Sequence, residues 1–285
     1  MKKLIAANWK MNKTVKESIE FVKEFKKLVK KIKNVYIVIC PAFTALQAVS
    51  KALKGSDIKL GAQNMHFEDS GAYTGEISPA MLKEIGCEYV ILGHSERREI
   101  GENDLLINKK VIAALKHGLK PILCIGENLE QRKNNKTKII IENQLKNCLN
   151  NIDKNQILKV NIAYEPVWAI SKGDPKHKAA TSKDAEEGHK LIRYILAKMY
   201  GSNAAKKVRV IYGGSMKPEN AKELLAMPNI DGGLVGNASL NAKSFAEIVK
   251  FATNKDILNR TFGMVKGKWK KSAQKIKNQA RKELY

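Results

Sequence analysis

Three polar side chains stand at the ends of apolar runs. Together they could move a proton next to a carbonyl group. Lys10, His94 and Glu165 each end or closely follow a short apolar run. A carboxylate can take a proton from carbon, while an imidazole and an ammonium group stabilise the negative charge that forms on oxygen. Each residue alone also has an ordinary reading as a structural histidine, a helix cap or a solvated charge. The pattern predicts proton transfer only if the fold brings the three together.

Two glycine-rich turns follow later apolar runs. They are Tyr212-Gly213-Gly214-Ser215 and Val235-Gly236-Asn237-Ala238-Ser239. Backbone N–H groups in such turns can bind a phosphate. The sequence contains no HExxH motif and no CxxC pair, and its four cysteines are far apart. We therefore predict a phosphorylated substrate, no metal, no other cofactor and no disulfide framework.

The elements that must position these residues recur at regular intervals over residues 1–252. Helical patterns separate the apolar runs, as in Lys16–Lys33, Lys109–His117 and Ile139–Leu149, and each βα unit takes about 31 residues. Eight units of this kind predict a (β/α)₈ barrel, whose chemistry lies at the C-terminal ends of the strands. An open doubly wound sheet is the alternative, weakened because no GxGxxG follows the first strand. The predicted strands are Leu4–Asn8, Val35–Pro41, Ile58–Gln63, Tyr89–His94, Pro121–Gly126, Val160–Glu165, Val208–Gly213 and Gly233–Gly236.

Residues 253–285 depart from the repeat. They hold ten Lys and Arg against two acids, a net charge of +8. Their apolar residues recur every three or four positions, which predicts an added C-terminal helix, although Gly263 and Gly267 disfavour its first half. We expect two domains, the barrel over 1–252 and a basic amphipathic extension over 253–285.

The charge of the whole chain raises a further question about partners. The 285 residues carry 52 Lys and Arg against 28 Asp and Glu, a net charge of +24. A surface this basic attracts polyanions. The N-terminus lacks a secretory h-region and no stretch reaches the roughly 20 apolar residues of a membrane helix, so we predict a cytoplasmic protein.

Seven segments resemble the triosephosphate isomerase family in order and spacing. They are NWKMN from Asn8, GAQN from Gly61, TGE from Thr74, ILGHSERR from Ile91, AYEPVWAI from Ala163, YGGS from Tyr212 and LVG from Leu234. The resemblance covers residues 1–252. It implies a (β/α)₈ homodimer without a cofactor that interconverts dihydroxyacetone phosphate and D-glyceraldehyde 3-phosphate in glycolysis and gluconeogenesis.

The resemblance also implies roles for single residues. Glu165 matches the family's catalytic base and His94 its neutral electrophile. Lys10 matches the cation near the substrate oxygen and phosphate. Asn8 matches the residue that orients this lysine, and Glu96 the carboxylate that pairs with it when no substrate is bound.

Further matches concern the lid, the phosphate and the dimer. The lid corresponds to Pro166–Ala180 and its first hinge to Pro166, Val167 and Trp168, with Glu127 as the partner of Trp168 in the open lid. Tyr212 and Ser215 match the latch of the closed lid. Thr74, in the loop Asn64–Pro79, matches the residue that reaches into the neighbouring subunit. The phosphate is expected on backbone N–H groups of Ser171, Ser215, Gly236 and Asn237.

Three departures from the family pattern stand out. The lid tip reads Ser171-Lys172-Gly173 where the family has Gly-Thr-Gly, and about four extra residues, 174–177, follow it. Asn237 replaces a glycine. The segment from Arg98 to Glu102 is one residue shorter than usual, which puts the local salt bridge in question.

Two other functions compete with catalysis. The basic tail could bind an anionic polymer or a membrane surface. We favour instead a helix that packs on the barrel or on the dimer partner, and we expect neither nucleic acid nor membrane as a partner. A pseudo-enzyme that acts as an adhesin or scaffold conflicts with the presence of Lys10, His94 and Glu165.

Overall fold

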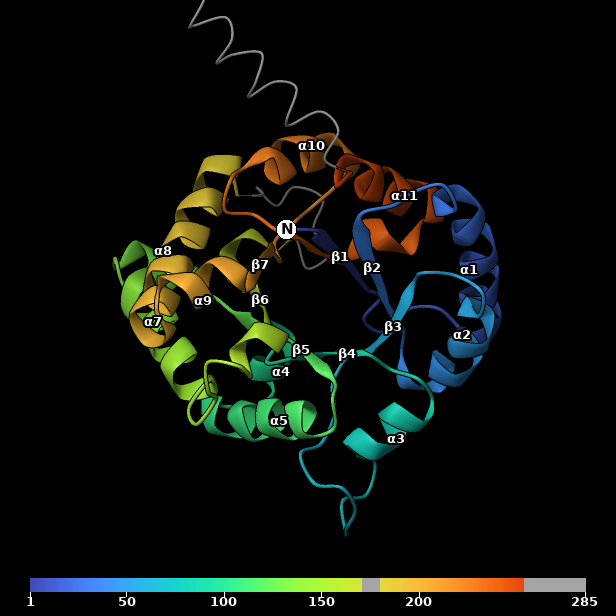
Figure 1. Ribbon diagram of the computed structural model, residues 1–285, viewed down its shortest axis with the longest axis horizontal. Helices are drawn as coiled ribbons and strands as arrows, with labels where there is room; N and C mark the ends of the chain where they lie inside the picture. The colour runs from blue at the N-terminus through green and yellow to red at the C-terminus, as the bar shows by residue number, and fades with distance from the viewer. Residues whose placement is uncertain (171–179, 254–285) are drawn as a thin grey trace, which may run out of the picture. The chain divides into compact units, whose positions relative to one another are not determined.

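A computed structural model describes residues 1–170 and 180–253 of the chain. Eight parallel strands pair in sequence order, and β1 closes the ring with β8, so the sheet is a barrel and not the open alternative (Figure 1). The strands are β1 (Lys3–Asn8), β2 (Val35–Cys40), β3 (Lys59–Ala62), β4 (Tyr89–Leu92), β5 (Lys120–Ile125), β6 (Asn161–Tyr164), β7 (Arg209–Tyr212) and β8 (Gly232–Val235).

Helices surround the barrel, as Figure 1 shows. The α-helices are α1 (Val15–Val29), α2 (Leu46–Leu53), α3 (Pro79–Glu84), α4 (Ser95–Glu99), α5 (Asp104–Lys116), α6 (Leu129–Lys133), α7 (Thr137–Cys148), α8 (Ser182–Tyr200), α9 (Ser202–Lys207), α10 (Pro218–Ala226) and α11 (Ala242–Phe251). Short 3₁₀ turns are η1 (Phe43–Ala45), η2 (Ile157–Lys159), η3 (Val167–Ala169) and η4 (Asn237–Leu240).

Two helices begin or end at residues other than those the sequence pattern predicts. The pattern Lys109–His117 is the second part of α5, which starts at Asp104 because the Asn103 side chain accepts a hydrogen bond from the N–H of Leu106. In contrast, α1 ends at Val29, four residues before the predicted Lys33, and the left-handed Asn34 turns the chain into β2.

Two apolar cores flank the strands. Residues such as Leu4, Ile122 and Ile211 fill the inside of the barrel, and a larger cluster lies between the strands and the helices. The strands are therefore covered on both faces, which is why their sequences are apolar almost throughout.

Residues Met1–Ala252 form one compact unit. The helix predicted within 253–285 lies outside the described residues, which end at 253. Among the residues that are described, no helix is long and apolar enough to cross a membrane.

Candidate active site

A cavity of about 820 Å³ opens at the C-terminal ends of the strands. The connections that follow five of the strands, β1, β4, β6, β7 and β8, contribute to its wall, so residues far apart in the sequence meet there. Of the residues singled out in the sequence, the wall includes Asn8, Lys10, His94, Glu96, Glu165, Ser215, Gly236 and Asn237.

Glu165 follows β6 and is only 2% exposed. Its Oε1 lies 3.3 Å from His94 Nε2, and its Oε2 accepts a hydrogen bond of 3.1 Å from the N–H of Ser95. Two glycines make room for it: a Cβ on Gly126 would lie 1.8 Å from the Glu165 carbonyl oxygen, and one on Gly213 would lie 2.6 Å from its Cγ. The carboxylate is thus held in a closely packed position at the rim.

His94 is the N-cap of α4, and this position fixes its tautomer. The N–H of Glu96 donates a hydrogen bond of 3.2 Å to His94 Nδ1. Because Nδ1 is an acceptor, the neutral ring carries its proton on Nε2. That N–H is the group that can donate to a substrate oxygen beside Glu165.

Lys10 has an uncommon left-handed backbone with φ of 53°. Its N–H donates to Asn8 Oδ1 at 3.1 Å, and its carbonyl accepts from Gln63 Nε2 at 2.9 Å, so neighbours on both sides hold the turn. The ammonium Nζ lies 2.6 Å from Glu96 Oε1. The site therefore presents a fixed cation that is paired with a carboxylate.

The structure describes three of the four residues predicted to bind phosphate. Gly236 and Asn237 stand at the start of η4, where backbone N–H groups are available to an anion. The N–H of Ser215, by contrast, donates to the carbonyl of Ala169 at 3.3 Å. Ser171 lies outside the described residues, as do the altered lid tip and the extra residues 174–177.

The start of the lid is tied to a buried carboxylate. Trp168 Nε1 and the Tyr164 hydroxyl donate to Glu127 at 2.9 and 3.2 Å. The Arg132 guanidinium lies 4.1 Å from the centre of the Trp168 ring and forms an ion pair of 2.7 Å with Asp184 on α8. Arg132 thus contacts residues on both sides of the lid segment. No sequence motif points to it, because it lies in an ordinary polar helix.

The other predicted lid residues are partly described. Pro166 precedes η3, and Val167 is its first residue. Tyr212 is buried, which raises the pKa of its hydroxyl, and the hydroxyl has no hydrogen-bond partner among the described atoms. Cys124 is fully buried near Glu165, and burial raises its pKa, so it is an inert thiol at neutral pH.

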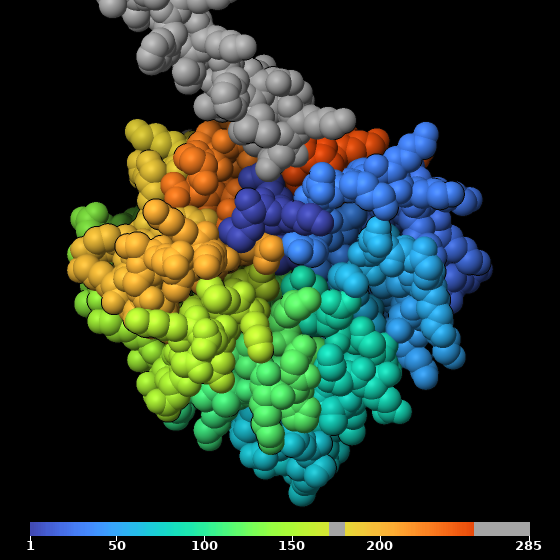
Figure 2. Space-filling view, in the orientation of Figure 1, coloured from blue at the N-terminus to red at the C-terminus, as the bar shows by residue number. Residues whose placement is uncertain are grey.

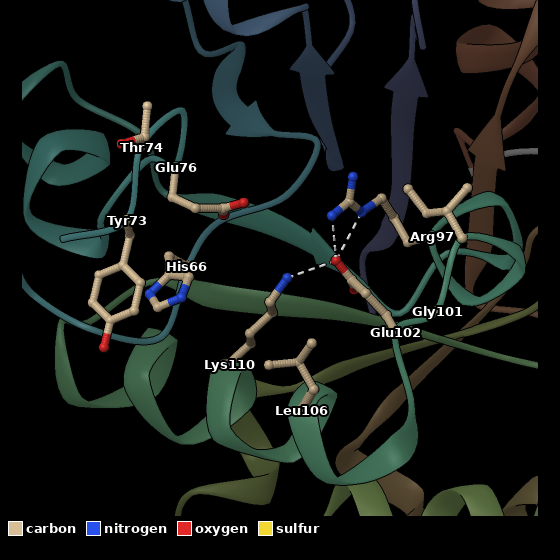
Figure 3. A pocket seen from close by; sticks show the side chains of 10 residues that line it. His66, Tyr73, Thr74, Glu76, Arg97, Gly101, Glu102, Leu106 and Lys110 are labelled. Atoms are coloured by element: carbon tan, nitrogen blue, oxygen red, sulfur yellow. Dashed lines mark hydrogen bonds and ion pairs between the residues drawn. The ribbon is translucent and has the colours of Figure 1, made fainter. Parts of the chain in front are cut away.

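The shortened segment after Arg98 retains its ion pairs. Glu102 accepts from Arg97 and Lys110 at 2.7 Å each (Figure 3), and Arg98 pairs with Asp104 at 2.6 Å. Burial opposes ionisation of Glu102, but the two cations lower its pKa below the ordinary value. A cavity of about 390 Å³ lies beside this group, and Thr74 is part of its wall (Figure 3).

Comparisons with known proteins agree with this geometry. The triosephosphate isomerase family model matches residues 3–252. The chain is 54% identical over 249 residues to the triosephosphate isomerase of Clostridium botulinum strain Loch Maree, covering 87% of this chain and 98% of that protein. It is also 54% identical over 250 residues to the enzyme of Carboxydothermus hydrogenoformans, with the same coverage. The crystal structure of triosephosphate isomerase from Bartonella henselae superimposes with a TM-score of 0.79 at 40% identity, over 88% of this chain and 99% of that one. The chain belongs to the triosephosphate isomerase family, the isomerases of glycolysis that interconvert dihydroxyacetone phosphate and D-glyceraldehyde 3-phosphate.

Proposed function

We propose that Glu165, His94 and Lys10 carry out triose-phosphate isomerisation in this chain. Glu165 removes a proton from the carbon next to the substrate carbonyl and returns it to the neighbouring carbon. His94, through its Nε2–H, and Lys10, through its ammonium group, stabilise the enediolate oxygen that forms between the two steps. The observation that carries the proposal is the 3.3 Å approach of Glu165 to His94 inside the cavity that Lys10 also lines.

Two contacts of the site must change when substrate binds. Glu165 has to leave the N–H of Ser95 to reach a substrate carbon, and Lys10 has to exchange Glu96 for substrate oxygens. Asn8 supports this exchange because its side chain holds the Lys10 backbone in place. The backbone N–H groups of Gly236 and Asn237 are the proposed phosphate ligands, with Ser171 and Ser215 joining them when the lid closes over the intermediate. Pro166, Val167 and Trp168 form the proposed hinge and Tyr212 the latch.

A single substitution tests this assignment. Glu165→Gln keeps the size of the side chain and removes the base, so we expect kcat to fall by at least about 10³-fold without loss of the fold. Turnover in a coupled assay, with circular dichroism to follow folding, measures both. Glu20→Gln, on the exposed face of α1, is the matched control, and full activity of Glu165→Gln would reject the assignment.

We also propose that the chain acts as a homodimer through the loop that contains Thr74. Large apolar side chains are exposed on the connections around this loop, with Met11 at 96% and Ile100 at 70%, as expected of a surface that a partner covers. The cavity beside Glu102 offers a place for a partner's loop. Light scattering should give about twice the chain mass of 31.8 kDa, and a fully active monomer would contradict the proposal.

The remaining assignments concern organisation and location. Residues 1–252 are the proposed catalytic domain and 253–285 an extension of it. A cytoplasmic location is supported by four buried cysteines that are all free, as is typical of proteins from a reducing compartment.

A further inference from the structure

The end of the barrel opposite the active site carries a group of cations where the strands begin. Lys2, Lys59, Lys120 and Arg209 stand at the N-terminal ends of β1, β3, β5 and β7. Side chains two residues further along three of these strands, Leu4, Ile122 and Ile211, fill the barrel interior. Alternate residues of a strand share a face, so the four cations, here called the floor cations, stand on the inner side of the ring.

Two tyrosine rings contact three of the four floor cations. Lys2 Nζ and the Arg209 guanidinium lie 5.5 and 4.8 Å from the ring centre of Tyr36, and Lys120 Nζ lies 5.1 Å from that of Tyr89. Arg209 Nε also donates to the carbonyl of Lys2 at 3.1 Å. The Tyr36 ring therefore brings the charges of Lys2 and Arg209 close together.

Neutralising carboxylates are scarce at this end. Glu88 pairs with Lys59 and Lys120 at 2.8 and 3.3 Å. Within residues 1–170 and 180–253, no ion pair joins Lys2 or Arg209 to a carboxylate at 4.0 Å or less. Both are therefore available to an external anion.

The surrounding connections have the same sign. The segments that enter the strands at this end, 1–3, 30–35, 54–59, 85–89, 117–120, 149–161, 201–209 and 227–232, hold 13 Lys and Arg against four Asp and Glu, a net charge of +9. The described connections at the active-site end, 9–14, 41–45, 63–78, 93–103, 126–136, 165–170, 180–181, 213–217 and 236–241, hold eight against nine, a net charge of −1. Among the connections that the structure describes, the excess positive charge therefore lies at one end.

This end faces the viewer in Figures 1 and 2, with the N-terminus near its centre.

We propose that the N-terminal end of the barrel binds the phosphate backbone of a nucleic acid, without sequence preference, through Lys2, Lys120 and Arg209. Lys2 and Arg209 have no carboxylate partner among the described residues, and Lys120 shares Glu88 with Lys59. Such cations are suited to successive phosphates, and these contacts gain free energy by releasing counterions. A membrane surface is the less suitable partner, because peripheral membrane binding needs buried apolar area. In the described segments of this end, only Met1 and Leu158 are large, apolar and exposed.

The test uses the full-length chain and a fluorescent 20-nucleotide single-stranded DNA of mixed sequence. The triple variant Lys2→Gln, Lys120→Gln, Arg209→Gln removes three proposed contacts. Each contact contributes about 0.7 to the slope of log K against log salt, so affinity at 0.1 M salt should fall by about 100-fold and the slope should decrease by about two. Fluorescence anisotropy across a salt series measures both.

The matched control removes the same charge at the opposite end. Lys16, Lys138 and Lys243 are exposed in the first turns of α1, α7 and α11, and the triple Lys→Gln change there should leave most of the affinity intact. Equal losses in the two triple variants would overturn the proposal, because binding would then depend only on net charge.

If the triple variant of the floor cations does not fold, a second variant tests the proposal. Glu88→Gln removes the carboxylate that pairs with two floor cations, so it should tighten DNA binding several-fold, and unchanged or weaker binding would contradict the proposal. The last measurement is sedimentation of the chain with vesicles containing 30 mol% phosphatidylserine, which tests for binding to a membrane. Floor-dependent binding to vesicles but not to DNA would overturn the proposal in favour of a membrane.

Discussion

The two ends of the barrel differ in the balance and pairing of their charged side chains. In the described connections at the active-site end, cations and carboxylates nearly balance. The groups near the reaction are held close to one another: Lys10 forms an ion pair with Glu96, and the His94 ring lies 3.3 Å from Glu165. In the connections at the N-terminal end, positive charge exceeds negative charge by nine, and within residues 1–170 and 180–253 no carboxylate pairs with Lys2 or Arg209. Precise local pairing is typical of chemistry on a small substrate, whereas accumulated charge of one sign is typical of attraction to a polyanion. The overall charge of +24 therefore gives little information about the catalysed reaction.

The largest expected difference between the two ends comes from replacing one lysine at each end of β1 by glutamine. Lys10→Gln removes a charge that stabilises the transition state, so we expect kcat/KM to fall by about 10³-fold. Lys2→Gln, before the other end of the strand, should change kcat/KM by less than about twofold. Steady-state kinetics on both variants decides, and similar losses would show that the two ends are not functionally separate.

Asp231 tests whether the N-terminal end also stabilises the fold. Its carboxylate pairs with Arg193 and accepts from the N–H of Val210 at 2.9 Å. Asp231→Asn breaks a largely buried ion pair, so unfolding in urea should require about 3 kcal/mol less, with kcat unchanged. Asp57→Asn, in an exposed pair with Lys33, is the control and should have little effect. A drop in kcat for Asp231→Asn would couple the two ends.

The smallest expected effect, on the free energy of unfolding, comes from His189, which lies at neither end of the barrel. It is fully buried on α8, and burial lowers its pKa from 6.5 to about 4. The unfolded chain takes up this proton below pH 6.5 and the folded chain does not, so the stabilisation is present above pH 6.5 and is lost as pH falls towards 4. The wild type should lose roughly 2 kcal/mol more than His189→Gln between pH 7 and 4.5. Parallel pH profiles of urea unfolding would contradict this.

Sequence patterns predicted the barrel well because strands covered on both faces must be apolar along their length. They also located Lys10, His94 and Glu165, since each ends or follows such a strand. They did not predict the left-handed backbone of Lys10, the space that Gly126 and Gly213 leave for Glu165, or the contact of Arg132 with Trp168. These features depend on contacts between residues distant in the sequence, which periodicity does not record.

Proton exchange at carbon tests the central claim most directly. Dihydroxyacetone phosphate is converted in D₂O, and deuterium at carbon 2 of the product is measured by mass spectrometry. If Glu165 is the base, its carboxyl group exchanges the abstracted proton with solvent before returning it. The wild type should then incorporate deuterium at this carbon, and Glu165→Gln should show none above the uncatalysed level. Incorporation by Glu165→Gln at the wild-type rate would contradict the account.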